Sequence, residues 1–205
     1  PAGSSTGITW STAAQIPTPL GAVGMDIAAH NGAPYAAWGT RSNEYNSMLQ
    51  IRVAKKLPNQ PWQTPLYVTE LAGAFENPRI AVSESGMHLL LTDWSGLFYL
   101  RSENEGQTWS APAVLTNAHY AALRADADYA YVIFNRYTAP DNSRMHFAKI
   151  YKNDNAFSEP VFIFSNVAYK TAVHVKDFDI SGPRVALLTY ALSGYGGYYQ
   201  NFLHE

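Results

Sequence analysis

The sequence contains no cysteine, which excludes disulfide bonds and thiolate metal sites and leaves the redox compartment open. Charge is scarce: charged residues are 15% of the chain, with 14 basic and 16 acidic side chains and a net charge of −2. Because no run of one sign occurs, neither nucleic acid nor an anionic membrane surface is expected as a partner. No stretch approaches about 18 consecutive apolar residues, so membrane insertion is not expected either.

Helical periodicity and targeting signals are also missing. No segment sustains the roughly 3.6-residue apolar period of an amphipathic helix. The chain has no N-terminal signal pattern and begins at Pro1, which suggests a piece processed or excised from a longer protein. We expect no cofactor and no metal. The six histidines lack metal-ligand spacing, and the pairs Asp126/Asp128 and Asp177/Asp179 offer too few oxygens for Ca²⁺.

What the sequence does have is a repeat. An aromatic residue recurs at the same place in a local pattern, each time before an apolar run, at positions that differ by 52, 47 and 48 residues. These aromatic residues are Trp10, Trp62, Trp109 and Phe157. A period of about 40 to 50 residues built from short strands is typical of propeller blades.

Each repeat divides into four strand-like segments. In the second repeat they are residues 79–82, 87–92, 97–101 and 109–115, separated by glycine-containing turns. The sequence therefore predicts an all-β fold, a β-propeller of about four blades with four antiparallel strands each. We expect one domain over residues 1–205, with repeats at 17–70, 71–117, 118–166, and 167–205 together with 1–16.

The ends of the chain allow two arrangements. The fourth repeat contains only three strands, and residues 8–16 look like a fourth strand without a blade. Pairing residues 8–16 with the strand near 198–203 would close the ring and protect two sheet edges. The alternative is an open fragment of a larger propeller, completed by further blades or domains of a longer parent chain.

One turn carries a family resemblance. Residues 102–109 read Ser-Glu-Asn-Glu-Gly-Gln-Thr-Trp, which resembles the Asp-box, Ser-x-Asp-x-Gly-x-Thr-Trp, of sialidase-like β-propellers with BNR repeats. Asn104 stands where the family has Asp, and the other copies retain less of the motif. The resemblance implies a structural role for Ser102, Asn104, Gly106, Thr108 and Trp109, since the box is a folding device and identifies no reaction.

The resemblance does not extend to a sialidase catalytic set. The family's first arginine lies in an Arg-Ile-Pro motif near the N-terminus, whereas this chain reads Pro78-Arg79-Ile80-Ala81 after the first repeat. Only eight arginines are present to hold a substrate carboxylate. We therefore assign no catalytic residue.

A binding site is expected on the face that collects the loops between blades and between second and third strands. The candidates there are aromatic, charged or both, as recognition of a sugar or peptide requires. They are Arg41, Tyr45, Glu76, Trp94, His119, Tyr120, Arg136, Tyr137, Asp141, Arg144, Tyr169 and Tyr195.

The function predicted from these features is a non-catalytic module, extracellular or on the cell surface, that binds a glycan or protein ligand through its loop face. Two alternatives stand beside it. The first is part of a sialidase-like glycoside hydrolase, an exo-glycosidase whose other blades lie elsewhere. The second is a structural spacer.

Overall fold

The computed structural model describes residues 15–16, 22–41, 49–70, 76–138, 142–165, 173–181, 184–192 and 199–204. Their strands form four antiparallel sheets, which we number in chain order. Sheet 1 contains β1 (Ala22–His30), β2 (Ala33–Arg41), β3 (Leu49–Lys55) and β4 (Leu66–Glu70). Sheet 2 contains β5 (Glu76–Ser83), β6 (Gly86–Thr92), β7 (Gly96–Ser102) and β8 (Ala113–Thr116). Sheet 3 contains β9 (His119–Ala125), β10 (Tyr129–Thr138), β11 (Asn142–Tyr151) and β12 (Val161–Ser165). Sheet 4 contains β13 (Val173–Ser181), β14 (Arg184–Leu192) and β15 (Tyr199–His204).

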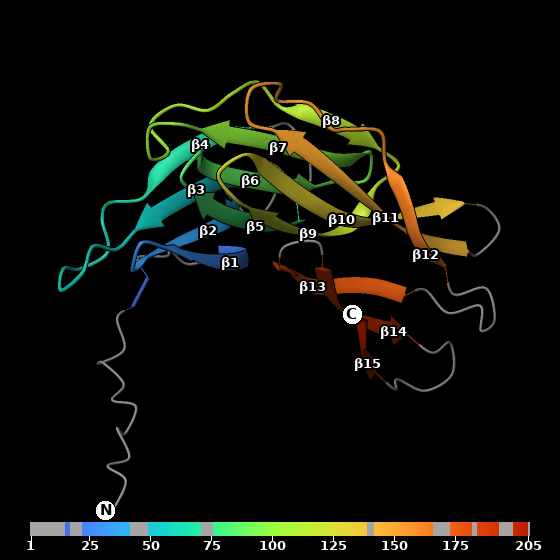
Figure 1. Cartoon of the computed structure of the whole chain (residues 1–205). Coiled ribbons are helices and arrows are strands. Elements are labelled where there is room, and N and C mark those ends of the chain that lie inside the picture. The colour runs from blue at the N-terminus through green and yellow to red at the C-terminus, as the bar shows by residue number, and fades with distance from the viewer. Residues whose placement is uncertain are drawn as a thin grey trace, which may run out of the picture.

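The sheets follow one another around an axis (Figure 1). In each sheet the strands lie in chain order, so the first strand is at one edge and the last strand at the other. The first strands pack in the order β1, β5, β9 and β13, and they form the inner side of the arc. This is the predicted β-propeller architecture, and each described sheet lies within one of the four sequence repeats.

The core lies between neighbouring sheets, where alternate residues of each strand meet. One cluster joins sheets 1 and 2, a second joins sheets 2 and 3, and a smaller one joins sheets 3 and 4. Sheets 2 and 3 are therefore buried on both faces, which is why β6 reads as a nearly continuous apolar run. Fully buried members include Ile51, Leu89, Leu91, Leu90, Tyr99, Val132, Phe134 and Ile133.

The Asp-box-like turn closes as the sequence predicts. The Ser102 Oγ accepts a hydrogen bond from the Gly106 backbone N–H at 2.8 Å, and the Asn104 Oδ1 accepts one from the Thr108 N–H at 2.9 Å. The Trp109 Nε1 donates to the Gly106 carbonyl at 3.1 Å. Gly106 has φ = 88°, and a Cβ there would lie 3.1 Å from the Val53 Cγ2. The turn of sheet 2 thus fits closely against sheet 1.

The repeated aromatic residue has one structural role in every described repeat. Trp109 of sheet 2 packs into the cluster between sheets 1 and 2, and Phe157 of sheet 3 packs into the cluster between sheets 2 and 3. Each blade therefore sends this side chain toward the preceding blade. Trp62 of sheet 1 packs in the same sense, against Ala36 and Trp38 on the face that points away from sheet 2.

The fourth strand of sheet 2 is shorter than predicted and begins at Ala113 instead of 109. Ser110 makes only a single backbone bond, to Arg101, and Pro112 has no N–H.

The predicted closing strand, residues 8–16, lies outside the described residues except for its last two positions. Of these, Ile16 contacts the cluster around Trp38 in sheet 1. Within the described part of the chain, no helix is long and apolar enough to span a membrane.

Candidate functional site

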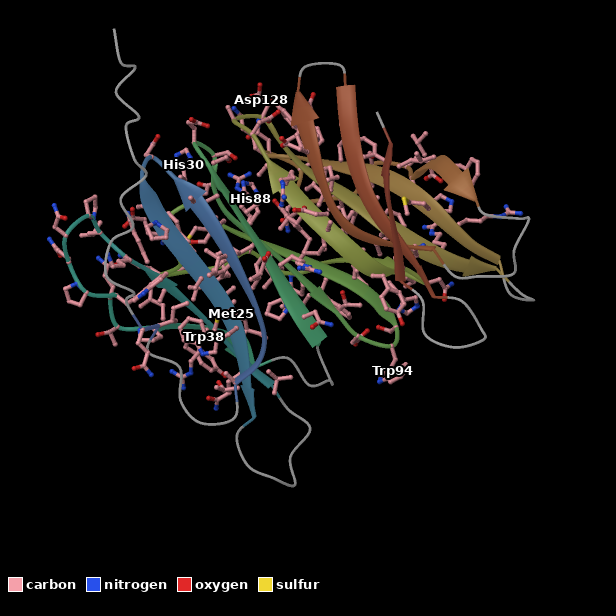
Figure 2. All side chains as sticks on the ribbon, turned by 90° about the horizontal axis from the view of Figure 1, so that it is seen from below. Met25, His30, Trp38, His88, Trp94 and Asp128 are labelled. Carbon is pink, nitrogen blue, oxygen red and sulfur yellow. The ribbon has the colours of Figure 1, made fainter. Side chains whose placement is uncertain are left out.

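The propeller has two distinct ends. The hairpins that join first and second strands carry His30 and Asp128, and Figure 2 shows both at one end of the sheets. Trp94, in the turn between β6 and β7, lies at the opposite end (Figure 2). The first strands also begin at this second end, because β1, β5, β9 and β13 run away from it toward their hairpins. We call this end the loop face.

Trp94 is the most exposed large hydrophobic side chain described, at 86% of its full accessibility. The turn that carries it is well ordered by hydrogen bonds. The Asp93 Oδ1 accepts from the Ser95 N–H and Oγ–H, both at 2.7 Å, and from the Gly96 N–H at 3.0 Å. An aromatic ring held in water by a rigid turn is a flat surface ready to stack on a ligand.

A second aromatic side chain lies where β9 begins. Tyr120 is half exposed and has φ = 48°, a backbone conformation that costs free energy in a bulky residue. The inner strands of sheets 1 and 2 have their own left-handed residues at the corresponding irregularity, Gly24 at φ = 62° and Asn77 at φ = 50°. A Cβ on Gly24 would lie 3.0 Å from the Asn77 Cα, so the two bulges pack together. The strained positions thus collect at the loop face near the axis.

Two arginines face each other at the same end of sheet 3. Arg136 of β10 and Arg144 of β11 are directly opposite in the strand register. The guanidinium of Arg136 lies 5.8 Å from the centre of the Phe134 ring, and its Nε is buried with no hydrogen-bond partner among the described residues. Burial lowers the pKa of His146, the hydrogen bond to the Arg144 carbonyl opposes this, and the charges of both arginines add to the lowering. Like charges on opposite strands repel, and an anionic group would relieve that repulsion.

The inner strands carry charged residues that link one sheet to the next. The Asp26 Oδ2 accepts a hydrogen bond from the Ile80 N–H at 2.9 Å, and the Arg79 Nε donates to the Ala121 carbonyl at 3.3 Å. The Arg124 Nη2 pairs with the Asp177 Oδ1 at 2.5 Å. The four side chains, Asp26, Arg79, Arg124 and Asp177, keep between a quarter and a half of their surface exposed.

Asp26, Arg79 and Arg124 are not among the residues that the sequence predicts for the site. The available signal was a charge in the middle of an inner strand, at equivalent positions of different repeats. Asp26, Arg79 and Asp177 each lie four residues before the last residue of their strand. Their partners are 42 to 54 residues away in sequence, so no local pattern reveals them.

The structure brings together only part of the predicted set. Trp94, His119, Tyr120, Arg136 and Arg144 lie at the loop face on sheets 2 and 3, with His119 half buried. The backbone of Arg41, Glu76 and Tyr137 is at strand ends on this face, and nothing is described of their side chains. Tyr45, Asp141, Tyr169 and Tyr195 lie outside the described residues. No group of three or more metal-binding side chains occurs in the described ranges.

A separate polar cluster lies near the hairpin end. His88 is fully buried, with its Nδ1 2.6 Å from the Tyr99 hydroxyl and its Nε2 3.2 Å and 3.1 Å from the hydroxyls of Ser83 and Ser85. Burial, then the charge of Arg101, lowers the pKa of His88 to about 4. Every polar atom of the imidazole has a partner, so the cluster is a neutral, satisfied part of the core.

Comparison with solved structures supports the fold. The chain is similar to an endo-arabinanase of family GH43 from Bacillus licheniformis, with 13% identity and a TM-score of 0.57 over 95% of this chain and 81% of that one. It is similar to an exo-1,5-α-L-arabinanase from a bovine ruminal metagenomic library, with 12% identity and a TM-score of 0.56 over 87% and 72%. A xylan β-1,4-xylosidase from Bacillus halodurans C-125 matches with 11% identity and a TM-score of 0.54 over 89% and 41%.

At these identities the likeness establishes a common propeller fold, shared with glycoside hydrolases, and no more. No protein-family model matches the sequence, and no match is found among curated proteins. The relation to sialidases suggested by the Asp-box-like turn is not shown by these comparisons.

Proposed function

We propose that this chain is part of a glycoside-hydrolase-like β-propeller protein and that its loop face binds polysaccharide. The observation that carries the proposal is Trp94, an almost fully exposed indole on a turn that three hydrogen bonds to Asp93 hold in place. The apolar face of a sugar ring packs on such a surface, and the hydroxyls around it need polar partners nearby. Tyr120 supplies a further aromatic surface, and the two opposed arginines supply polar partners for the hydroxyls.

The fold favours a carbohydrate ligand over the protein ligand that the sequence left open. The similar solved structures are described as arabinanases and a xylan β-1,4-xylosidase, names that refer to polysaccharide substrates. Because such polymers lie outside cells, we also propose an extracellular or cell-surface location. The arginine pair would suit a glycan that carries carboxylates.

Affinity electrophoresis in gels containing arabinan, xylan or polygalacturonate tests binding, with 3′-sialyllactose examined by titration calorimetry. Trp94→Ala should weaken binding by roughly ten-fold or more, as loss of a central aromatic contact does. Tyr151→Ala is the matched control, because Tyr151 is an exposed aromatic residue near the hairpin end. Absence of binding to all four glycans, or equal weakening by both variants, would refute the proposal.

We propose hydrolysis as a second activity of the parent protein, because glycosidases use two carboxylates flanking the bond that is cleaved. Asp26 and Asp177 are carboxylates at equivalent positions of β1 and β13, both on the inner side of the arc and both partly exposed. Release of reducing sugar from arabinan or xylan should then fall strongly in Asp177→Asn. It should persist in the neighbouring control Asp179→Asn. Equal activity of the two variants would refute this role.

A further inference from the structure

The inner strands of sheets 1, 2 and 3 share one irregularity near the loop face. In each strand the register with its neighbour shifts once, and a residue with positive φ lies at the shift. These residues are Gly24 in β1 at φ = 62°, Asn77 in β5 at φ = 50° and Tyr120 in β9 at φ = 48°. Bulges of this kind re-aim side chains and are frequent beside functional sites.

Tyr120 is the exception among these three residues. Glycine has no Cβ to clash in the left-handed conformation and asparagine is enriched there, whereas a bulky side chain is an outlier. Deep packing of the ring does not offset this strain, because Tyr120 is 48% exposed. Since such strain persists mainly where function requires it, the aromatic side chain itself is the feature that the β9 bulge preserves.

The backbone that carries Tyr120 is bonded to the Trp94 turn. The Asn117 N–H donates a hydrogen bond to the Ser95 carbonyl at 3.1 Å. Ala118, the next residue, is fully buried in the cluster between sheets 2 and 3. Three residues of extended chain span at most about 10 Å, so Tyr120 lies within about 10 Å of Asn117. Tyr120 and Trp94 are therefore held on one bonded piece of backbone.

Charged side chains of the inner strands lie beside Tyr120. The Arg79 Nε donates to the carbonyl of Ala121, the residue that follows Tyr120, and the Arg79 Nη1 lies 4.0 Å from the Asp26 Oδ1. The side chains of Arg79 and Asp26 are 35% and 25% exposed, so they have donors and acceptors available to a ligand. An aromatic ring with such polar neighbours is the combination that a sugar unit requires.

The two aromatic residues lie at different distances from the axis. Tyr120 is on β9, the inner strand of sheet 3, whereas Trp94 lies between the second and third strands of sheet 2 (Figure 1). Because neighbouring strands are about 4.8 Å apart, the Trp94 turn is roughly 7 Å outward from the inner strand β5. A ligand chain that stacks on Trp94 and runs inward therefore reaches Tyr120.

We propose that Tyr120 is a specificity-determining residue of the loop face: its ring forms an inner subsite for one sugar unit, and the units that follow extend outward over Trp94. This inference rests on the proposed binding of polysaccharide and gives the bound chain a direction. A short ligand occupies the inner subsite, where aromatic and charged groups meet, and only a longer one also reaches Trp94.

Thermal unfolding separates a role in binding from a role in packing. Tyr120→Asn places at the β9 bulge the residue type that β5 has there. Its Tm should rise or stay within about 4 °C of the wild-type value, because relief of strain offsets the loss of a half-exposed ring. A larger fall would show that the ring is kept for packing and would overturn the proposal.

Titration calorimetry with a disaccharide and a hexasaccharide tests the subsite itself. The pair is arabinobiose and arabinohexaose, xylobiose and xylohexaose, or di- and hexagalacturonate, according to the polymer that binds in gels. Tyr120→Asn should weaken binding of both lengths by at least about ten-fold. Trp94→Ala should weaken the hexasaccharide by a similar factor and the disaccharide by less than about two-fold. Tyr120→Phe, the matched control, keeps the ring and should bind both within about three-fold of the wild type.

The outcomes distinguish this inference from the proposed function. If the wild type binds no hexasaccharide, the proposed function fails and the inner subsite fails with it. If the wild type binds and Tyr120→Asn binds equally well, only the inner subsite is refuted. Equal loss of the disaccharide in Trp94→Ala, or a wild type that binds the hexasaccharide but not the disaccharide, would also refute the subsite alone.

Discussion

Acid should destabilise this protein chiefly through the buried His88. His88 of β6 is fully buried, bonded to Tyr99 of β7 on one nitrogen and to Ser83 and Ser85 on the other, and it is neutral there. Its pKa is about 4 in the folded chain and 6.5 in a solvated histidine. Burial is the main cause, the Arg101 charge adds to it, and Asp126 opposes both.

The direction in which stability changes with pH follows from proton binding to His88. Between pH 6.5 and 4 the unfolded chain binds a proton at this residue and the folded chain does not, so the free energy of unfolding falls as the pH falls. The difference between the two pKa values corresponds to roughly 3 kcal/mol in the free energy of unfolding. This contribution is fully present above pH 6.5 and is lost by about pH 4. This is a large part of the stability of an ordinary domain.

Urea unfolding followed by tryptophan fluorescence at a series of pH values measures the loss. His88→Gln keeps a polar side chain that does not titrate, so its stability should fall less steeply than that of the wild type between pH 6.5 and 4. His30→Gln, at the β1–β2 hairpin, is the control and should retain the steep slope. Parallel curves for wild type and His88→Gln would refute the reasoning.

Further substitutions test the packing. Gly106→Ala should destabilise by about 1–3 kcal/mol, because φ is positive and Val53 is close, and by more than Gly32→Ala, where φ is positive but nothing lies within 4 Å; equal urea midpoints would contradict this. Phe134→Ala should cost about 3–5 kcal/mol, whereas Phe162→Ala, half exposed on β12, should cost much less; similar denaturation midpoints would argue against the sheet 2–sheet 3 core. Arg124→Gln should cost no more than about 1 kcal/mol despite its 2.5 Å contact with Asp177, since both side chains are well exposed; a larger loss in thermal unfolding would show that this link carries more stability than an exposed ion pair.

The sequence predicted the parts of this fold that depend on local patterns. The spacing of Trp62, Trp109 and Phe157 indicated the repeat. Trp109 and Phe157 each pack beside the preceding sheet, and Trp62 packs on the corresponding face of sheet 1. The turn at Ser102 to Trp109 was predictable for the same reason, since its hydrogen bonds span at most four residues.

What the sequence could not predict depends on contacts between sheets. His88 lies in a strand that is apolar on both faces, so alternation does not tell which neighbours surround it. The hydrogen bond from Ile80 to Asp26 spans 54 residues, and the ion pair of Arg124 with Asp177 spans 53. At such separations the sequence pattern does not tell which residues of two sheets meet. The sequence did not predict that Ile27 is exposed either, because β1 reads like β5, whose Ile80 is covered by sheet 1.

The central functional claim, that the loop face binds polysaccharide on Trp94, is tested most directly by the fluorescence of that residue. The other tryptophans with described side chains, Trp38, Trp62 and Trp109, are buried or half buried, so Trp94 is the described indole that a ligand reaches most readily. Saturation with the polysaccharide that binds in gels should shift the emission to shorter wavelength and protect it from iodide quenching, and Trp94→Ala should abolish both changes. Binding that leaves the emission unchanged, or a shift that persists in Trp94→Ala, would contradict the claim.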